Sequence, residues 1–241
     1  MIDYNNTITD SAELILSEIH NPDVLKQFSQ EELDLINNEV KEIHYEKGQK
    51  IIQEGSRPTG IYCITQGTAK LYKSGFNGKE QILRFMKKGE IIAYRSLLSD
   101  EDFASSCSAL DGLAAVYVPE ATFHKLLALS PTVSIELLKK LAIDLGNAEK
   151  TITLLAQKTV RERLAEILLW LESKLGVDEN GFIKISLTRE ETANLVGTAT
   201  ESAIRLISEF KSDGFIEVIG RRIKLLDKPR LIRLGEGHVP I

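Results

Sequence analysis

Cysteine, proline and long apolar runs are all scarce in this chain of 241 residues. Its 2 cysteines, Cys63 and Cys107, are too few for a disulfide framework, a four-thiolate iron–sulfur cluster or an all-cysteine zinc site, and we expect both to be reduced thiols. The 6 prolines and 16 glycines form no repetitive tract, which excludes a collagen-like or largely disordered protein.

No segment of the sequence is suited to a membrane or to export. The longest apolar runs, such as residues 167–171, fall far short of the ~20 residues that a membrane-spanning helix needs. The N-terminal segment has neither the basic start nor the apolar centre of a secretory signal peptide. We therefore predict a cytoplasmic protein that has no membrane partner.

Histidine is sparse as well. The 4 histidines show no paired ligand spacing along the chain: His20, His44, His124 and His238. The sequence therefore predicts no metal site and no cofactor, and nothing in it favours haem ligation. With no metal or catalytic cluster to carry a reaction, we expect that the protein is not an enzyme.

The charge is unevenly distributed. A net charge of −5 argues against a uniformly basic protein that coats nucleic acid. Residues 1–156 hold 16 basic and 22 acidic residues, whereas residues 157–241 hold 14 and 13. Near the C-terminus, six basic residues surround a single acid, Asp227: Arg221, Arg222, Lys224, Lys228, Arg230 and Arg233. Such a cluster is usually a solvated surface, but contact with phosphate groups requires the same feature.

Residues 40–118 have a sequence pattern that is typical of an antiparallel β-structure. Short runs rich in apolar and β-branched residues, separated by glycines, predict strands at residues 50–53, 60–65, 68–73, 81–86, 90–94 and 113–119. Asn77-Gly78 lies between two of these runs and is typical of a hairpin turn. The pattern predicts a sandwich or roll. A cupin-type enzyme would need several histidines in such a roll, and only His44 is available.

Helical patterns flank the β-region on both sides. The first forty residues read as helical, with a capping box at Ser29 and Glu32, and residues 120–129 form another helix. Ser130-Pro131 then begins a long helix over residues 132–156, about 36 Å in length. Its apolar residues approximate a heptad seam: Ile135, Leu138, Ala142, Leu145, Ile152 and Leu155. The seam packs either on the β-region or, as we favour given the length, on a second copy of the chain.

The C-terminal part predicts a helix–turn–helix. A helix over residues 158–175 and a short strand over residues 182–187 precede it. Residues 189–208 then have the spacing of a helix–turn–helix, with a small Ala193 where the two helices cross and Gly197 in the turn. At 100° per residue, the second helix turns its apolar residues inward and three polar residues outward: Glu201, Arg205 and Ser208.

The outward residues suit base recognition in DNA. Arginine binds guanine O6 and N7 and glutamate accepts from cytosine N4, which assigns these roles to Arg205 and Glu201. An ordinary solvated ion pair between the two is the alternative. We expect further contacts to phosphates or neighbouring bases from Arg189, Thr198, Thr200 and Ser202. Residues 214–227 predict a hairpin wing with Gly220-Arg221 at its tip, where Arg221 and Arg222 would bind phosphate.

From about residue 25 to residue 227, the sequence resembles the Crp/Fnr superfamily, the bacterial regulators that include the cyclic-AMP receptor protein and the fumarate-nitrate regulator. Three groups of motifs carry the resemblance: YEKGQKIIQEGSRPTGIYCITQGTAKLY, KKGEIIA, and ISLTREETANLVG with ESAIR and GFIEV. Glu201 and Arg205 fall on the family's base-reading positions. Thr200 stands where the cyclic-AMP receptor protein has a guanine-reading arginine, so the half-site is expected to differ from that of the receptor.

The resemblance implies an α+β fold with three parts. Residues 1–130 would form N-terminal helices and an antiparallel β-roll, a jelly roll like that of cyclic-nucleotide-binding domains, which acts as a sensor. Residues 131–156 would form a dimerisation helix, and residues 157–241 a winged helix–turn–helix. The implied partners are double-stranded DNA, a second copy of the chain, RNA polymerase and a small-molecule effector.

The family's cyclic-nucleotide cassette is only partly present. Gly89 and Glu90 match its start, but Tyr94 replaces the ribose-binding glutamate, and Ala104-Ser105 replaces the Arg-Ser pair that holds the cyclic phosphate. Without that arginine a strong charge-assisted bond is lost, so we expect that cAMP is not the effector. Either the altered cassette binds another anion or it packs without a ligand. The candidate ligand-binding residues are Gly89, Glu90, Tyr94, Arg95, Ser96, Ser105 and Ser106.

The sequence thus predicts a homodimeric regulator of transcription that binds a two-fold-symmetric operator. The alternative is a ligand-binding β-roll whose winged helix contacts protein rather than DNA.

Overall fold

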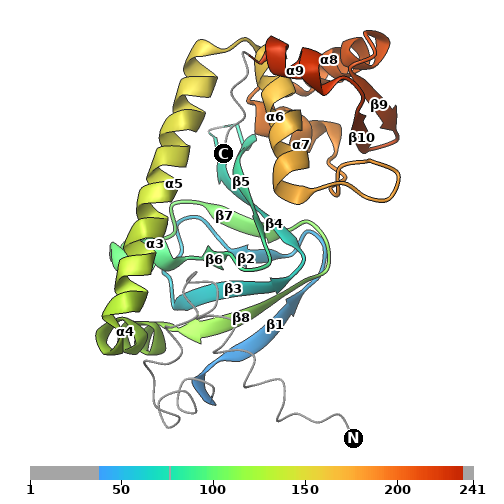
Figure 1. Cartoon of the computed structure of the whole chain (residues 1–241). Coiled ribbons are helices and arrows are strands. Elements are labelled where there is room, and N and C mark those ends of the chain that lie inside the picture. The colour runs from blue at the N-terminus through green and yellow to red at the C-terminus, as the bar shows by residue number, and fades with distance from the viewer. Residues whose placement is uncertain (1–37, 76, 236–241) are drawn as a thin grey trace, which may run out of the picture. The chain divides into compact units, whose positions relative to one another are not determined.

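The computed structural model describes residues 38–75 and 77–235 (Figure 1). The chain divides into two compact units, residues 1–142 and residues 143–241. The helical region predicted over the first forty residues lies outside the described residues up to residue 37, including the capping box of Ser29 and Glu32. Within the described residues, no helix is both long and apolar enough to cross a membrane.

Two four-stranded antiparallel sheets build the first unit (Figure 1). The first contains, in spatial order, β1 (Lys41–Tyr45), β8 (Leu113–Pro119), β3 (Gly60–Gln66) and β6 (Ile91–Ile92). The second contains β2 (Lys50–Ile52), β7 (Ser106–Ala109), β4 (Thr68–Ser74) and β5 (Glu80–Lys87). This architecture confirms the predicted β-roll.

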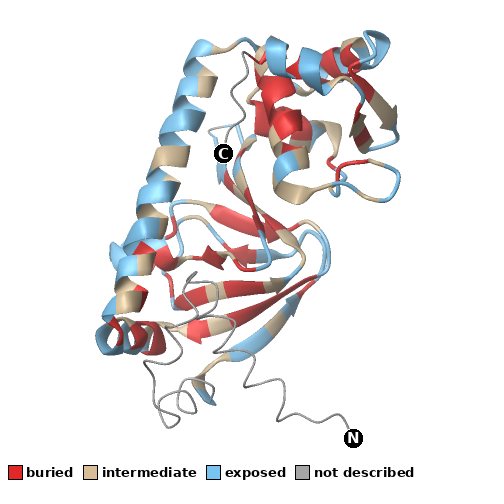
Figure 2. Ribbon diagram, viewed as in Figure 1, coloured by how far each residue is buried: buried red, intermediate tan, exposed pale blue. Residues whose placement is uncertain are grey.

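Most of β3 is buried (Figure 2), because its side chains contribute to two hydrophobic cores, one on each face of the strand. Ile61 and Cys63 point toward the helices of the unit, whereas Ile64 points into the space between the two sheets. Both cysteines of the chain, Cys63 and Cys107, are free and fully buried. Burial raises the pKa of Cys107 to about 12, so this thiol stays protonated and unreactive at neutral pH.

The β4–β5 hairpin predicted from Asn77-Gly78 is confirmed, but its loop is longer than a two-residue turn. The strands end at Ser74 and resume at Glu80, which leaves a loop over residues 75–79. The amide of Gly75 donates to the carbonyl of Lys79 over 2.8 Å and closes this loop. Gly78 has φ 71°, a conformation that favours glycine.

Several elements differ from the sequence prediction, among them β1, which none of the predicted strands covers. The strand predicted over residues 90–94 ends at Ile92, because Ala93 adopts φ 80° and α3 (Tyr94–Leu98) begins directly after it. Residues 106–109, with the small-residue sequence SCSA, form β7, which no apolar run signalled. The strand predicted over residues 182–187 is wrong, because only an isolated bridge joins Val177 and Ile183.

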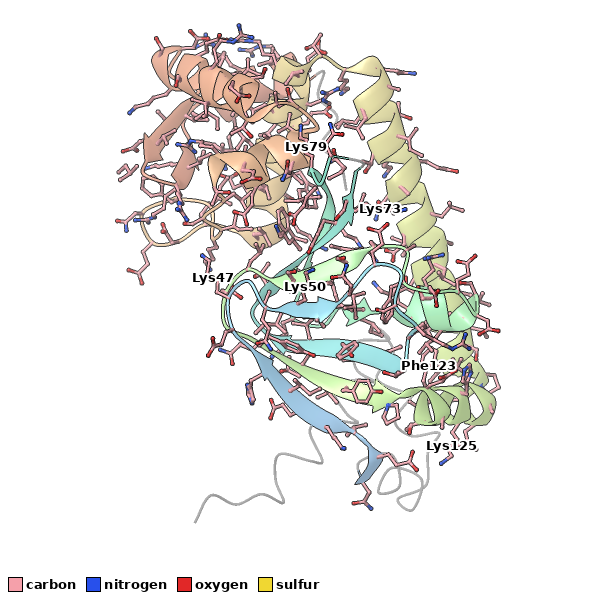
Figure 3. All side chains as sticks on the ribbon, turned by 180° about the vertical axis from the view of Figure 1, so that it is seen from behind. Lys47, Lys50, Lys73, Lys79, Phe123 and Lys125 are labelled. Carbon is pink, nitrogen blue, oxygen red and sulfur yellow. The ribbon has the colours of Figure 1, made fainter. Side chains whose placement is uncertain are left out.

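Two helices follow the roll, and their predicted limits are correct to within one residue: α4 (Glu120–Leu129) and α5 (Pro131–Gln157). The hydroxyl of Ser130 accepts from the amide of Val133 over 3.4 Å at the start of α5. Figure 3 labels Phe123 and Lys125 on α4; Phe123 is buried in the core, and Lys125 pairs with Glu39 over 3.0 Å.

The long helix α5 buries a different face from the predicted seam. Val133 and Leu137 are buried against the roll. The apolar residues of the seam and its flank are instead exposed by 50–66%: Ile135, Leu138, Ile143, Leu145 and Ile152. Within the first unit, Ile135 and Leu138 of the seam therefore lie outside the core of the roll.

After the end of α5, the described residues of the second unit form four helices and one hairpin, starting with α6 (Val160–Leu175). A capping box of Thr159 and Glu162 begins α6, and Gly176 with φ 75° ends it. The other elements are α7 (Arg189–Val196), α8 (Thr200–Ser212), β9 (Ile216–Ile219), β10 (Arg222–Leu225) and α9 (Lys228–Leu234). Phe210 and Phe215 meet edge to face in its core, with ring centroids 5.3 Å apart.

Gly60 gives a direct test of strand packing in the roll. A Cβ at Gly60 would collide with the carbonyl oxygen of Val118 and come within 2.6 Å of the Tyr117 ring. We expect Gly60→Ala to lower the free energy of unfolding by about 2–3 kcal/mol, measured by chemical denaturation. Gly112→Ala is the matched control, since a Cβ there meets nothing within 4 Å. Equal stability of the two variants would contradict this packing.

Candidate nucleic-acid interface

A capping box that the sequence analysis missed fixes the start of α7. The Thr188 hydroxyl accepts from the amide of Glu191 over 3.0 Å, and the Glu191 carboxylate accepts from the amide of Thr188 over 2.8 Å. The T-x-x-E spacing at residues 188–191 was the signal for it. At the other end of α7, Gly197 with φ 72° turns the chain toward α8.

The second helix, α8, is strongly amphipathic. Four apolar residues lie between 0% and 8% exposed and pack into the unit: Ala203, Leu206, Ile207 and Phe210. The opposite face carries Glu201, Arg205 and Ser208, all exposed. The structure therefore brings the two predicted base-reading side chains together on one face, one turn apart.

Arg205 pairs along the helix with a different acid from the one expected. Its side chain is 74% exposed, and its Nε lies 3.8 Å from the Glu209 carboxylate rather than on Glu201. Glu209 is also held by Arg161 at 2.9 Å. An exposed pair at 3.8 Å is worth at most about 1 kcal/mol, so the Arg205 guanidinium can turn to an outside partner at little cost.

The start of α8 has no side-chain cap from its N-cap residue. Its N-cap residue, Ala199, has no side-chain acceptor for the amides of the first turn. Thr198, Thr200 and Ser202 are half-buried around this turn. Amide groups and hydroxyls at a helix N-terminus suit a phosphate oxygen.

Arg189 reaches the wing instead of extending into solvent. Its Nη2 donates to the carbonyl of Gly220 at the wing tip over 3.0 Å, and its Nη1 is buried without a hydrogen-bond partner. The residue therefore joins the first helix of the helix–turn–helix to the tip of the wing.

The wing itself is the hairpin β9–β10, with Gly220 at φ 60° in its turn. Its two arginines differ. Arg221 is exposed, whereas Arg222 makes an ion pair with Asp178 and its guanidinium lies 4.4 Å from the centroid of the Phe182 ring. Desolvation works to raise the pKa of Asp178, but hydrogen bonds from the Phe182 amide and the Arg222 side chain hold it below its usual value.

Arg163, which the sequence analysis did not single out, holds the turn of the helix–turn–helix. It is 9% exposed, and its Nη1 donates to the carbonyls of Leu155 and Lys158 over 3.1 and 3.2 Å. Its Nη2 donates to the carbonyl of Gly197 over 3.1 Å. One guanidinium thus links the end of α5 to the turn before α8, a contact between distant segments that no local pattern reveals.

Comparison with known proteins agrees with this geometry. Residues 42–130 match the cyclic nucleotide-binding domain family, and residues 162–234 match the Crp-like helix-turn-helix domain family. The fumarate and nitrate reduction regulatory protein of Vibrio cholerae is 26% identical over 224 residues, which cover 91% of this chain and 88% of that protein. The CRP-like cAMP-activated global transcriptional regulator of Mycobacterium tuberculosis is 26% identical over 200 residues, which cover 82% of this chain and 89% of that protein. The chain belongs to the Crp/Fnr superfamily of transcription regulators.

A solved structure shows the same fold. FixK2 from Bradyrhizobium japonicum superimposes with a TM-score of 0.73 at 24% identity, over 81% of this chain and 96% of that one. The predicted combination of β-roll, long helix and winged helix–turn–helix is confirmed. Because the Crp/Fnr superfamily consists of transcription regulators, the prediction that the chain is not an enzyme is also confirmed.

The altered cassette of this Crp/Fnr chain lies around β6 and α3. Gly89, with φ 90°, and Glu90 form the turn before β6, and the Glu90 carboxylate accepts from the amide of Lys87 over 3.0 Å. Tyr94 is buried at the start of α3. Arg95 is exposed and pairs with Glu101 over 3.0 Å. Hydrogen bonds from Arg95 and Ser99 lower the pKa of Glu101.

The serines of the cassette also have partners inside the roll. Ser96 donates to the carbonyl of Asp102 over 3.4 Å, and the hydroxyl of Ser106 accepts from the amide of Glu54 over 3.0 Å. Ser105 is half-buried just before β7. The hydroxyls of Ser96 and Ser106 therefore bond to different segments of the roll. Among the described residues, no three side chains of His, Cys, Asp or Glu are placed to hold a metal ion.

The two wing arginines give opposite expectations for DNA binding. Arg221→Ala should reduce the slope of log affinity against log salt by about 1 for each wing on the DNA, since each lost phosphate contact changes it by ~0.9. Arg222→Ala should leave the slope unchanged and lower the thermal stability instead, because Asp178 and Phe182 lose their partner. For both variants, the slope is measured by fluorescence anisotropy at several salt concentrations, and the stability is measured by thermal denaturation. A slope that changes only with Arg222→Ala would overturn the assignment.

Proposed function

We propose that this Crp/Fnr regulator acts as a homodimer in the cytoplasm and binds a two-fold-symmetric operator through α8. The observation that carries the proposal is the polar face of α8, where Glu201 and Arg205 remain exposed while the apolar face is buried. In this proposal Arg205 reads a guanine, Glu201 accepts from a cytosine amino group, and Arg221 binds phosphate from the wing. RNA polymerase is the further protein partner that we propose for the DNA-bound dimer.

The exposed seam of α5 supports the homodimer. Leu138 and Leu145, exposed by 64% and 63%, are seven residues apart, the spacing of one heptad. An apolar seam of this length is costly to leave in water, and a second copy offers an identical seam. Two copies of α8 related by a two-fold axis would then bind half-sites about one helical turn apart.

Charges introduced into the seam test the dimer. We expect Leu138→Asp combined with Leu145→Asp to raise the dimer dissociation constant at least about 100-fold, because two buried leucines per chain are lost. The measurement is sedimentation equilibrium, with circular dichroism to verify the fold. Lys139→Asp is the matched control, since Lys139 is exposed on the same helix, pairs with Glu136 over 2.7 Å, and lies outside the seam. A double variant that remains dimeric would contradict the proposal.

Selection of random duplexes by the purified protein, followed by sequencing, tests the DNA-binding proposal as a whole. The expected result is a two-fold-symmetric consensus with a G·C pair in each half-site. No enrichment, either alone or with added metabolites from cell extract, would contradict DNA binding and favour the alternative in which the winged helix contacts protein.

We also propose that the roll responds to an effector other than cAMP. The match to the cyclic nucleotide-binding domain family supports a sensor role, while Ala104 offers no charge for a cyclic phosphate and Arg95 is paired with Glu101. The same selection run with cAMP should give the same consensus and enrichment. A consensus that appears only with cAMP would contradict this part of the proposal.

A further inference from the structure

One apolar residue of α8 is not buried. Ile204 is 45% exposed, whereas the other apolar side chains of the helix are at most 8% exposed. It does not belong to the buried core, so the fold of the unit does not explain an isoleucine at this position. A β-branched residue also has a lower helix propensity than alanine, which would serve an exposed helix position better.

Ile204 lies among the residues that we propose read DNA. It follows Glu201 by three residues and directly precedes Arg205, so its side chain flanks the exposed polar face near the N-terminal half of α8. The Ser208 hydroxyl, one turn further on, donates to the carbonyl of Ile204 over 3.0 Å. Ser208 therefore directs its hydroxyl back to the helix, and Ile204 supplies the apolar surface of this face.

The major groove offers one apolar group that distinguishes bases, the 5-methyl group of thymine. A branched aliphatic side chain can exclude water from that methyl group but makes no hydrogen bond to any base. We propose that Ile204 packs against the methyl group of a thymine next to the bases bound by Glu201 and Arg205, and so selects for thymine at one position in each half-site. The inference rests on the proposed function of α8.

Uracil substitution isolates this contact, because uracil lacks only the methyl group and keeps the hydrogen-bonding atoms of thymine. In the operator obtained by selection, each thymine of a half-site is replaced by uracil in turn, and affinity is measured by anisotropy. We expect one position at which uracil weakens binding about fourfold per half-site, the factor that one buried methyl group is worth.

Two variants make the test specific. Ile204→Ala should bind the thymine and the uracil operators equally, because the variant no longer reaches the methyl group. Leu226→Ala, which removes another exposed apolar side chain, should keep the full uracil effect. Both positions are exposed, so neither change removes a core contact.

The outcomes separate this inference from the function on which it rests. Failure to bind any duplex would contradict the proposed function. Tight binding with no uracil-sensitive position, or a uracil effect that persists in Ile204→Ala, would overturn the role of Ile204 alone. An affinity loss in Ile204→Ala without any change in uracil sensitivity would assign the side chain to the sugar–phosphate backbone and would also overturn the proposal.

Discussion

Burial of one face of α8 is the constraint on which the rest of the recognition surface depends. Phe210 and Ile207 are nearly inaccessible, and burial of each large apolar side chain contributes about 1.5–3 kcal/mol. The helix cannot rotate about its axis without exposing them, so the direction of Glu201 and Arg205 is fixed by packing on the other side of the helix. Arg163 adds a second restraint, since it holds the carbonyl of Gly197 in the turn that begins α8.

Some arginines of the C-terminal unit bond to groups within the fold, and others are exposed to solvent. Arg163, Arg189 and Arg222 bond to groups within the unit, whereas Arg205 and Arg221 remain exposed. This division explains how a unit with a nearly even balance of charge can present positive charge locally. The bonded arginines stabilise the fold, whereas Arg205, held only by an exposed pair with Glu209, and the exposed Arg221 can meet an anion. It also means that the count of basic residues near the C-terminus overstates the charge available for phosphate.

The sequence was most informative where a local pattern decides the structure. The 3.6-residue periodicity of α8, the Ser130-Pro131 start of α5 and the short apolar run of β3 each follow from the residues themselves. The strand β7 has small side chains and forms only because β4 and β2 pair with it on either side, which is a non-local cause. The Arg163 bonds and the pairing of Arg222 with Asp178 join segments far apart in the chain, so no window of sequence shows them.

The most direct test of the central claim asks whether Arg205 touches a guanine in the major groove. Methylation of guanine N7 blocks that contact, so methylation interference on the selected operator locates the guanine that is read. The account predicts interference at one guanine in each half-site for the unmodified protein, and loss of the interference at that guanine alone in Arg205→Ala. Interference that persists unchanged in Arg205→Ala, or none in either protein, would contradict the claim that the exposed face of α8 reads bases.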